Sequence, residues 1–201
     1  MVEKGELQTE RRAVMTIKDM GQRALLRYVR SITHPATSRF VIADRIKLGG
    51  MVGSFPVISI NETFLTHFNG HIEESVPAGE IHYWELMKHS KDPPIVEALG
   101  GPELAQTHLA RLVQEIELGA DGPGHFSSEL WGGTPNIHYK VSPVDGKLYV
   151  VYWYQKNRKM DKKGREVGGG ELGFGAHPIP VDLPAWWSGF PVCGGQRPSL
   201  T

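Results

Sequence analysis

A short segment of the chain, residues 67–89, is rich in side chains that can bind metal ions. It holds four of the nine histidines and four glutamates. Imidazole nitrogens and carboxylate oxygens are ligands for zinc, iron and manganese. One hypothesis is therefore a metal-dependent enzyme whose ligands come from this segment, although their spacing matches no established metal motif. The candidate ligands are His67, His71, Glu73 and His82.

Other patterns that mark catalytic sites are missing from the sequence. There is no Gly-x-Ser-x-Gly elbow, no phosphate loop ending in Gly-Lys-Ser/Thr and no His-Glu-x-x-His pair. The one cysteine, Cys193, lies in a Gly-rich stretch with no base beside it, so we interpret it as an ordinary thiol. These observations favour a protein that is not an enzyme, and they identify no cofactor.

A row of aromatic residues leads directly into a row of cations. Residues 149–154 include three tyrosines and one tryptophan, and residues 156–165 include six Lys and Arg. Proteins hold single-stranded nucleic acid by stacking bases on aromatic rings and placing cations near phosphates. A second hypothesis is therefore a single-stranded nucleic-acid-binding protein that uses segment 149–165, whereas the simpler interpretation is a core strand followed by a solvated loop. The candidate nucleic-acid-binding residues are Lys156, Arg158, Lys159, Lys162 and Lys163.

The last part of the chain, residues 164–201, combines many glycines and prolines with large apolar side chains. Gly and Pro exclude regular structure throughout, yet a disordered linker would be poorer in aromatic residues. We therefore expect a tail that lies against an apolar surface. The hypothesis we prefer is a non-enzymatic structural or interaction subunit of a larger assembly, such as a viral or phage particle, whose partner is itself or another protein. The expected partner-binding residues are Trp186, Trp187 and Phe190.

A folded core must position these candidates, and the stretch 136–156 is the clearest sign of one. Apolar and polar residues alternate in its first half, and an Asp-Gly pair then supplies a tight turn. Its second half is apolar or aromatic on both alternating faces, as is typical of a central strand covered on both sides. The stretch therefore predicts a hairpin at the centre of an antiparallel sheet.

Two helices are expected to pack against this sheet. Residues 16–33 have apolar side chains at helical spacing, with Thr16 as N-cap and Asp19 three residues later. Residues 102–118 begin with a proline, carry an apolar stripe and end at a glycine. The predicted fold class is α+β: an antiparallel sheet centred on a hairpin at 136–156, packed by two helices, with a long irregular Gly/Pro/Trp-rich C-terminal tail.

Shorter elements are predicted between these helices. Residues 40–47 and 55–60 are predicted as strands, and residues 63–68 as a continuation of the sheet. Residues 80–89 are predicted as a short helix.

Length and composition set the remaining bounds. The chain has 201 residues and a formal net charge of zero, but its charge sums to +5 over residues 1–50, −8 over 51–150 and +3 over 151–201. No apolar run is long enough to cross a membrane, and no signal segment is recognised, so we expect a soluble, non-secreted protein that is cytoplasmic or particle-associated and has no membrane partner. The expected organisation is an N-terminal arm (1–15), an α+β domain (16–163) and an extended C-terminal tail (164–201).

Overall fold

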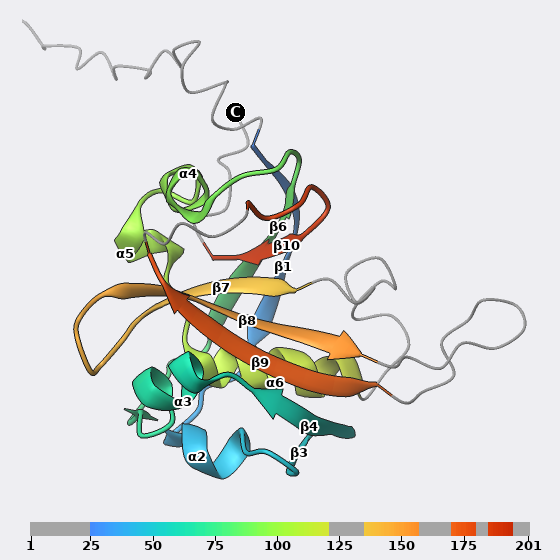
Figure 1. Ribbon diagram of the computed structural model, residues 1–201, viewed down its shortest axis with the longest axis vertical. Helices are drawn as coiled ribbons and strands as arrows, with labels where there is room; N and C mark the ends of the chain where they lie inside the picture. Colours follow the sequence, from blue (N-terminus) through green and yellow to red (C-terminus); the bar gives the residue numbers. More distant parts are fainter. Residues whose placement is uncertain (1–24, 121–134, 157–169, 180–184, 195–201) are drawn as a thin grey trace, which may run out of the picture.

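The computed structural model describes residues 25–120, 135–156, 170–179 and 185–194. They form a mixed α+β fold with one eight-stranded sheet and a separate two-stranded sheet (Figure 1). No helix within these ranges is long and apolar enough to cross a membrane. The sheet is mostly antiparallel, and the helices are few and mostly short.

The elements follow one another along the chain as follows. The strands are β1 (Leu26–His34), β2 (Phe40–Val41), β3 (Met51–Val52), β4 (Phe55–Ile60), β5 (Ile72–Glu73), β6 (Gly79–Leu86), β7 (Asn136–Val141), β8 (Leu148–Lys156), β9 (Glu171–Pro178) and β10 (Pro191–Cys193). The helices are α2 (Ile42–Arg45), α3 (Glu62–Phe68), α4 (Asp92–Ala98), α5 (Pro102–Ala105) and α6 (Leu109–Ala120). The large sheet has the strand order β1-β6-β10-β7-β8-β9-β4-β3, and β2 pairs with β5.

The hairpin predicted at residues 136–156 is confirmed as β7 and β8, which pair antiparallel. Gly146 in the turn has a φ of 69°, a left-handed conformation that glycine adopts without steric cost. Because β8 lies between β7 and β9, it is also a central strand of the sheet, as its sequence predicts.

The two faces of β8 pack differently. On one face, Trp153 is 1% exposed and lies in a core that includes the apolar side of α6. On the other face, Val150 belongs to a second core that residues of α4 and α5 complete. The next side chains on that second face, Tyr152 and Tyr154, are only half-buried. β8 is thus fully covered on one side and partly open on the other.

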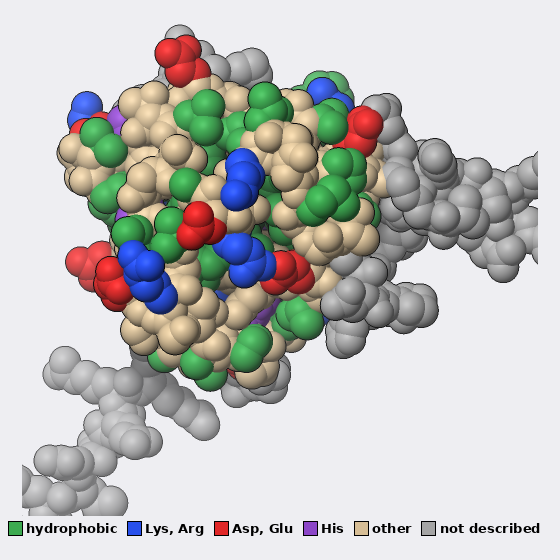
Figure 2. All heavy atoms as spheres, turned by 90° about the horizontal axis from the view of Figure 1, so that it is seen from below, with side chains coloured by type: hydrophobic (Ala, Val, Ile, Leu, Met, Phe, Trp, Pro, Cys, Tyr) green, Lys and Arg blue, Asp and Glu red, His purple; other side chains and the backbone are tan. Residues whose placement is uncertain are grey.

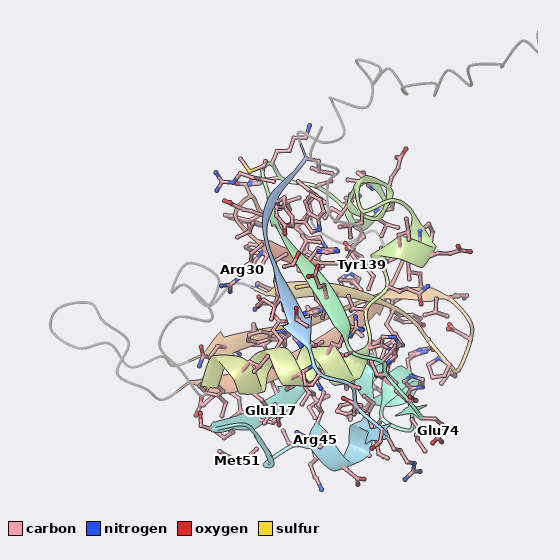
Figure 3. All side chains as sticks on the ribbon, turned by 180° about the vertical axis from the view of Figure 1, so that it is seen from behind. Arg30, Arg45, Met51, Glu74, Glu117 and Tyr139 are labelled. Atoms are coloured by element: carbon pink, nitrogen blue, oxygen red, sulfur yellow. The ribbon has the colours of Figure 1, made fainter. Side chains whose placement is uncertain are left out.

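The predicted helix over 102–118 is interrupted in the structure. It begins at the expected proline as α5, breaks at residues 106–108 and resumes as α6, which lies across the sheet (Figure 3). The break occurs because the backbone there pairs with the sheet: the amide of Thr107 donates a 2.9 Å hydrogen bond to the carbonyl of Tyr139 in β7. Pairing with β7 therefore outweighs the local helical pattern.

The prediction of a helix over 16–33 is wrong for its described part, because residues 26–34 form β1. Apolar residues at helical spacing also suit a strand when several are β-branched, as Val29 and Ile32 are. β1 pairs antiparallel with β6 from Leu26 to His34, with one register shift. The predicted cap at Thr16 lies outside the described residues.

The short helix predicted over residues 80–89 is also wrong, because this segment forms most of β6. Ile81 and Tyr83 are buried, whereas His82 and Trp84 between and after them are half-buried. This alternation has the period of two that defines a strand. β6 pairs with β1 on one side and with β10 on the other.

The remaining short predictions are partly correct. Residues 55–60 form β4, as predicted. Residues 63–68 lie in α3 instead of continuing the sheet, because the Asn61 side chain accepts a 2.8 Å hydrogen bond from the amide of Phe64 and caps a helix. The predicted strand over 40–47 is a strand at its first two residues and then the short helix α2.

Two strands of the large sheet come from the segment 164–201, which was expected to be irregular. β9 pairs antiparallel with β8 and parallel with β4, and β10 pairs antiparallel with β6 and parallel with β7. Residues 164–169, 180–184 and 195–201 of this segment, and the predicted N-terminal arm over residues 1–15, lie outside the described residues.

Candidate functional site

One face of β8 and β9 carries a row of aromatic side chains. In Figure 1 this face is turned toward the viewer, and α6 lies behind the two strands. The rings of Tyr152 and Tyr154 have centroids 6.4 Å apart and planes inclined by 24°. We define the aromatic face as Tyr152, Tyr154, Lys156, His177 and Trp186.

β9 has room for the tyrosine rings because the two residues beneath them are glycines. A Cβ atom on Gly175 would lie 2.4 Å from Cζ of Tyr152, and one on Gly173 would lie 2.3 Å from Cζ of Tyr154. The Tyr154 hydroxyl also hydrogen-bonds the Ser59 hydroxyl of β4 at 3.0 Å. The tips of both rings therefore lie directly over the backbone of β9, and no other residue type fits there without moving them.

Trp186 closes one end of the aromatic face. Its ring stacks on His177, with centroids 5.6 Å apart and planes inclined by 18°, and it contacts Tyr152 edge-on at 5.7 Å. Phe190 packs against Trp186 on the side of the second core. The row of rings is thus continuous with the hydrophobic core at this end.

Lys156 forms the opposite end of the aromatic face. Its ammonium group lies 5.2 Å from the centroid of the Tyr154 ring, within the range of a cation–π interaction. Lys156 is exposed and pairs in register with Glu171 of β9. It is the one predicted nucleic-acid-binding residue that the structure describes. The others, Arg158, Lys159, Lys162 and Lys163, lie outside the described residues.

The predicted metal ligand His67 is already engaged through both ring nitrogens. Nδ1 lies 3.0 Å from the Ser142 hydroxyl, and Nε2 lies 3.0 Å from the Tyr149 hydroxyl. The Tyr149 hydroxyl in turn donates to Asp145 at 3.0 Å. This network fixes the turn between β7 and β8 against α3, so the structure gives His67 a positioning role in the fold.

Glu73 has a structural role that accounts for its burial. Its carboxylate accepts hydrogen bonds from the amides of Leu109 and Ala110, at 3.1 and 2.9 Å, and thereby caps α6. Lys140 donates to it at 2.7 Å. Burial by itself raises the pKa of Glu73, but the hydrogen bonds from His108, Lys140 and Ala110 outweigh burial and lower the pKa to about 2.

His71 and His82 occupy different surroundings. His71 Nε2 lies 3.9 Å from Glu73 Oε1, and burial together with the nearby charge of Lys140 lowers the pKa of His71. His82 Nδ1 lies 2.7 Å from the Ser31 hydroxyl on β1. No three of the four predicted ligands, all of them described, bring donor atoms within 4.8 Å of one another. A metal site built from these four residues stays a prediction.

An open pocket of about 360 Å³ lies between α3 and the turn that joins β7 to β8. Two of the predicted histidines line it, but His67 uses both ring nitrogens for the network described above, which leaves the imidazole of His71. The pocket therefore offers one imidazole and few other polar groups. Its lining residues are Thr66, His67, Gly70, His71, Ile72, Pro143 and Val144.

A cluster of three polar side chains lies inside the fold, where the sequence predicts no site. Glu115 of α6, His138 of β7 and Cys193 of β10 are each 0% exposed, and their donor atoms all lie within 4.8 Å of one another. His138 Nε2 is 3.2 Å from Glu115 Oε2. His138 Nδ1 is 3.3 Å from the Thr107 hydroxyl. We call Glu115, His138 and Cys193 the buried trio.

The surroundings of the buried trio disfavour a charged thiol. Burial and the carboxylate of Glu115 raise the pKa of Cys193 well above its ordinary value. Burial and Glu115 likewise raise the pKa of Tyr83, which lies beside the trio. A thiol that is both protonated and inaccessible is a poor nucleophile, so the trio is not arranged for attack on a substrate.

The three residues predicted to bind a partner differ in their exposure. Trp186 and Phe190 pack against the second core, whereas Trp187 is 64% exposed and contacts His89 with ring centroids 5.4 Å apart. A tail contact with another subunit would thus involve chiefly Trp187 among these three.

The end of the molecule formed by α2 and β3 carries charges of both signs. Figure 2 shows acidic and basic side chains interspersed over this end. Arg45 of α2 forms an ion pair with Glu117 of α6, and the two residues lie next to each other in Figure 3. The charges at this end are therefore of mixed sign instead of forming a patch of one sign.

Comparisons with protein-family models, with curated proteins and with solved structures find no match. Function must therefore be inferred from the residues themselves.

Proposed function

We propose that the chain binds single-stranded nucleic acid on its aromatic face. The observation that carries this proposal is the pair Tyr152 and Tyr154, two half-buried rings side by side on the face of β8 that points away from α6. Bases stack on aromatic rings whatever their sequence, and each stacked base contributes about 1–3 kcal/mol. Two neighbouring rings provide places for two bases.

Cations for the phosphates lie at one end of these rings. The ammonium of Lys156 is 5.2 Å from the Tyr154 ring, so a base on that ring brings its phosphate close to a positive charge. Five more Lys and Arg follow in residues 158–165. The rings on β8 are thus followed by a cation at its end and by more cations in the sequence beyond it, a combination that suits binding of a single strand.

Two acidic residues adjoin the aromatic face and must be considered. Glu171 lies opposite Lys156 and reduces the local positive charge. Asp92 accepts hydrogen bonds from Trp186 and Tyr139, which offset its negative charge. Because Glu171 weakens the contribution of Lys156, we propose that most of the electrostatic affinity comes from residues 158–165.

The proposal is tested by fluorescence anisotropy with a labelled oligothymidine of about 12–16 nucleotides at low ionic strength. Tyr152→Ala and Tyr154→Ala should each weaken binding about 5- to 150-fold, which corresponds to one lost base stack. Trp187→Ala is the matched control, because it removes an exposed ring that contacts His89 instead of the aromatic face. Circular dichroism confirms that each variant is folded.

Salt dependence provides a second measurement. Neutralising Lys159, Lys162 and Lys163 together should weaken binding and flatten its dependence on salt, because fewer counterions are released. Absence of binding by the intact chain at low ionic strength would remove the proposal. Binding that both tyrosine variants leave unchanged would place the nucleic acid elsewhere on the molecule.

A second candidate function is the non-enzymatic subunit of a larger assembly. The exposed indole of Trp187 favours it, since large exposed apolar side chains mark contact surfaces when they gather with others. Light scattering of the full chain at increasing concentration, compared with Trp187→Ser, measures self-assembly. A full chain that stays monomeric at high concentration would speak against self-assembly, and another protein would then be sought as partner.

A further inference from the structure

We propose that the buried trio binds a zinc ion. The three side chains come from three separate elements, α6, β7 and β10, and their donor atoms converge within 4.8 Å. Carboxylate, imidazole and thiolate are all ligands of zinc, and three protein ligands leave one coordination position for a further ligand. This inference is independent of nucleic-acid binding.

Unsatisfied polar atoms point into the site. Both carboxylate oxygens of Glu115 and Nε2 of His138 are buried; Nε2 lies 3.2 Å from Oε2, beside the Tyr83 hydroxyl, but the contact lacks good hydrogen-bond geometry. Burying a polar group without a well-placed partner is unfavourable, and burying an unpaired charge is more so. A bound cation would satisfy the carboxylate and the imidazole at once.

The imidazole of His138 is oriented for this role. Its Nδ1 lies 3.3 Å from the Thr107 hydroxyl, so Nε2 is the nitrogen turned toward Glu115. Histidine ligands of zinc commonly engage their second nitrogen in this way, which fixes the ring orientation. Ligand atoms around tetrahedral zinc are about 3.3–3.8 Å apart; Nε2 of His138 and Oε2 of Glu115 already lie 3.2 Å apart, and the other donor pairs lie within 4.8 Å.

Charge balance favours a divalent cation. Zinc binding would displace the thiol proton of Cys193 to solvent, and the resulting thiolate and the Glu115 carboxylate would together neutralise the two positive charges of zinc in a fully buried site. The guanidinium of Arg30 lies 5.8 Å from the centre of the Tyr83 ring and adds positive charge near the site. A ligand set with two anions is therefore better suited there than one with neutral ligands alone.

Zinc would also add a link between the short strand β10 and the elements α6 and β7. β10 has only three residues, and it carries Cys193 at its end. A metal bridge from Cys193 to α6 and β7 would hold this strand in the sheet. Although three protein ligands leave a position open, full burial of all three keeps a substrate away from the ion, so a structural role is the expected one.

The test uses the full, untagged chain, unfolded with a chelator and refolded under reducing conditions with cobalt(II) as a spectroscopic substitute for zinc. Because Cys193 is the only cysteine, a thiolate-to-cobalt charge-transfer band can arise only from this residue. The expected result is one cobalt per chain, a charge-transfer band and its loss when zinc is added. Zinc should also raise the melting temperature.

Two variants distinguish this site from the sequence-predicted one. Cys193→Ser should abolish the charge-transfer band. His71→Ala, which alters the ligand set predicted from the sequence within residues 67–89, should leave the band unchanged. The absence of a band from the refolded intact chain, together with no effect of zinc on its melting temperature, overturns the proposal. A band that disappears in His71→Ala also overturns the proposal, because the metal would then be bound by the ligands predicted within residues 67–89.

Discussion

The indole Nε1 of Trp186 donates a 2.7 Å hydrogen bond to Oδ1 of Asp92, the first residue of α4. The same oxygen accepts a 2.9 Å hydrogen bond from the Tyr139 hydroxyl, and Oδ2 lies 3.2 Å from His177 Nε2. Burial and Asp92 together raise the pKa of Tyr139 well above its ordinary value. One carboxylate thus connects α4, β7, β9 and the segment before β10.

Replacing this carboxylate should destabilise the fold. Asp92→Ala leaves the Trp186 and Tyr139 donors without an acceptor, and we expect a loss of about 2–4 kcal/mol in the free energy of unfolding. Asp92→Asn retains one acceptor oxygen for both donors and should cost less. Urea denaturation of the two variants measures the difference. Equal losses would mean that the charge, and not the acceptor oxygen, stabilises the contact.

Trp153 should be among the most costly core positions. Its side chain is 1% exposed in the core that α6 covers. Trp153→Ala is expected to reduce the free energy of unfolding by about 3–5 kcal/mol. Chemical denaturation measures the loss, and Trp187→Ala, at a side chain that is 64% exposed, is the control for removal of an indole. A loss below about 1 kcal/mol would contradict the burial of Trp153.

Glu73 should make stability depend on acid pH. Its pKa is about 2 in the folded chain and near 4.5 when unperturbed, so the unfolded chain binds the proton first. The stability that Glu73 contributes is therefore complete above about pH 4.5 and is lost as the pH falls toward 2. Urea unfolding at several pH values should show a steeper decline for the intact chain than for Glu73→Gln. Parallel declines in the two chains would rule out this role.

Gly173 should be required for the position of Tyr154. Gly173→Ala places a Cβ 2.3 Å from the ring and should move it off β9, at a cost of about 1–3 kcal/mol in stability. If nucleic acid stacks on Tyr154, binding should weaken as well. Gly70→Ala is the matched control, because a Cβ there meets nothing within 4 Å. Anisotropy and thermal unfolding measure the two effects. Unchanged stability would show that the ring adapts without cost.

Truncation after Arg165 should unfold the chain. The change removes β9 and β10, which lie inside the large sheet between other strands. Loss of two internal strands exposes both cores, so we expect near-ultraviolet circular dichroism to lose its folded signal. A truncation after Gly194, which removes only residues beyond the described part, is the control. A chain that stays a folded monomer after truncation at Arg165 would instead support an accessory tail, which is the organisation that the sequence predicts.

The sequence predicts elements correctly where one periodic pattern dominates. The hairpin at 136–156 is confirmed because its alternation and its Asp-Gly turn favour the same structure. β1 and β6 are missed because their apolar spacing suits both helix and strand, and the choice depends on pairing between segments about 50 residues apart. α3 is missed although Asn61 is a good N-cap, a local signal that would have indicated a helix.

The candidate sites show the same division between local and distant information. Tyr152, Tyr154 and Lys156 are adjacent in sequence, so their proximity is predictable from a strand pattern. The members of the buried trio, by contrast, are far apart in the sequence, and no spacing rule connects them. Their one sequence signal is a polar residue in an apolar pattern: Glu115 follows Val113 and precedes Ile116 on the buried side of α6. Only the tertiary fold brings the three together.

β10 has a consequence for how the molecule is made. Because this three-residue strand lies between β6 and β7, it is the link that joins β1 and β6 to the other five strands of the sheet. It is also the last described element along the chain. During synthesis, β6 and β7 can emerge from the ribosome long before the strand that joins them, so the sheet can close only after residue 193 has left the exit tunnel. Until then each part exposes an unpaired edge, and a chaperone that covers strand edges would have its greatest effect at this stage.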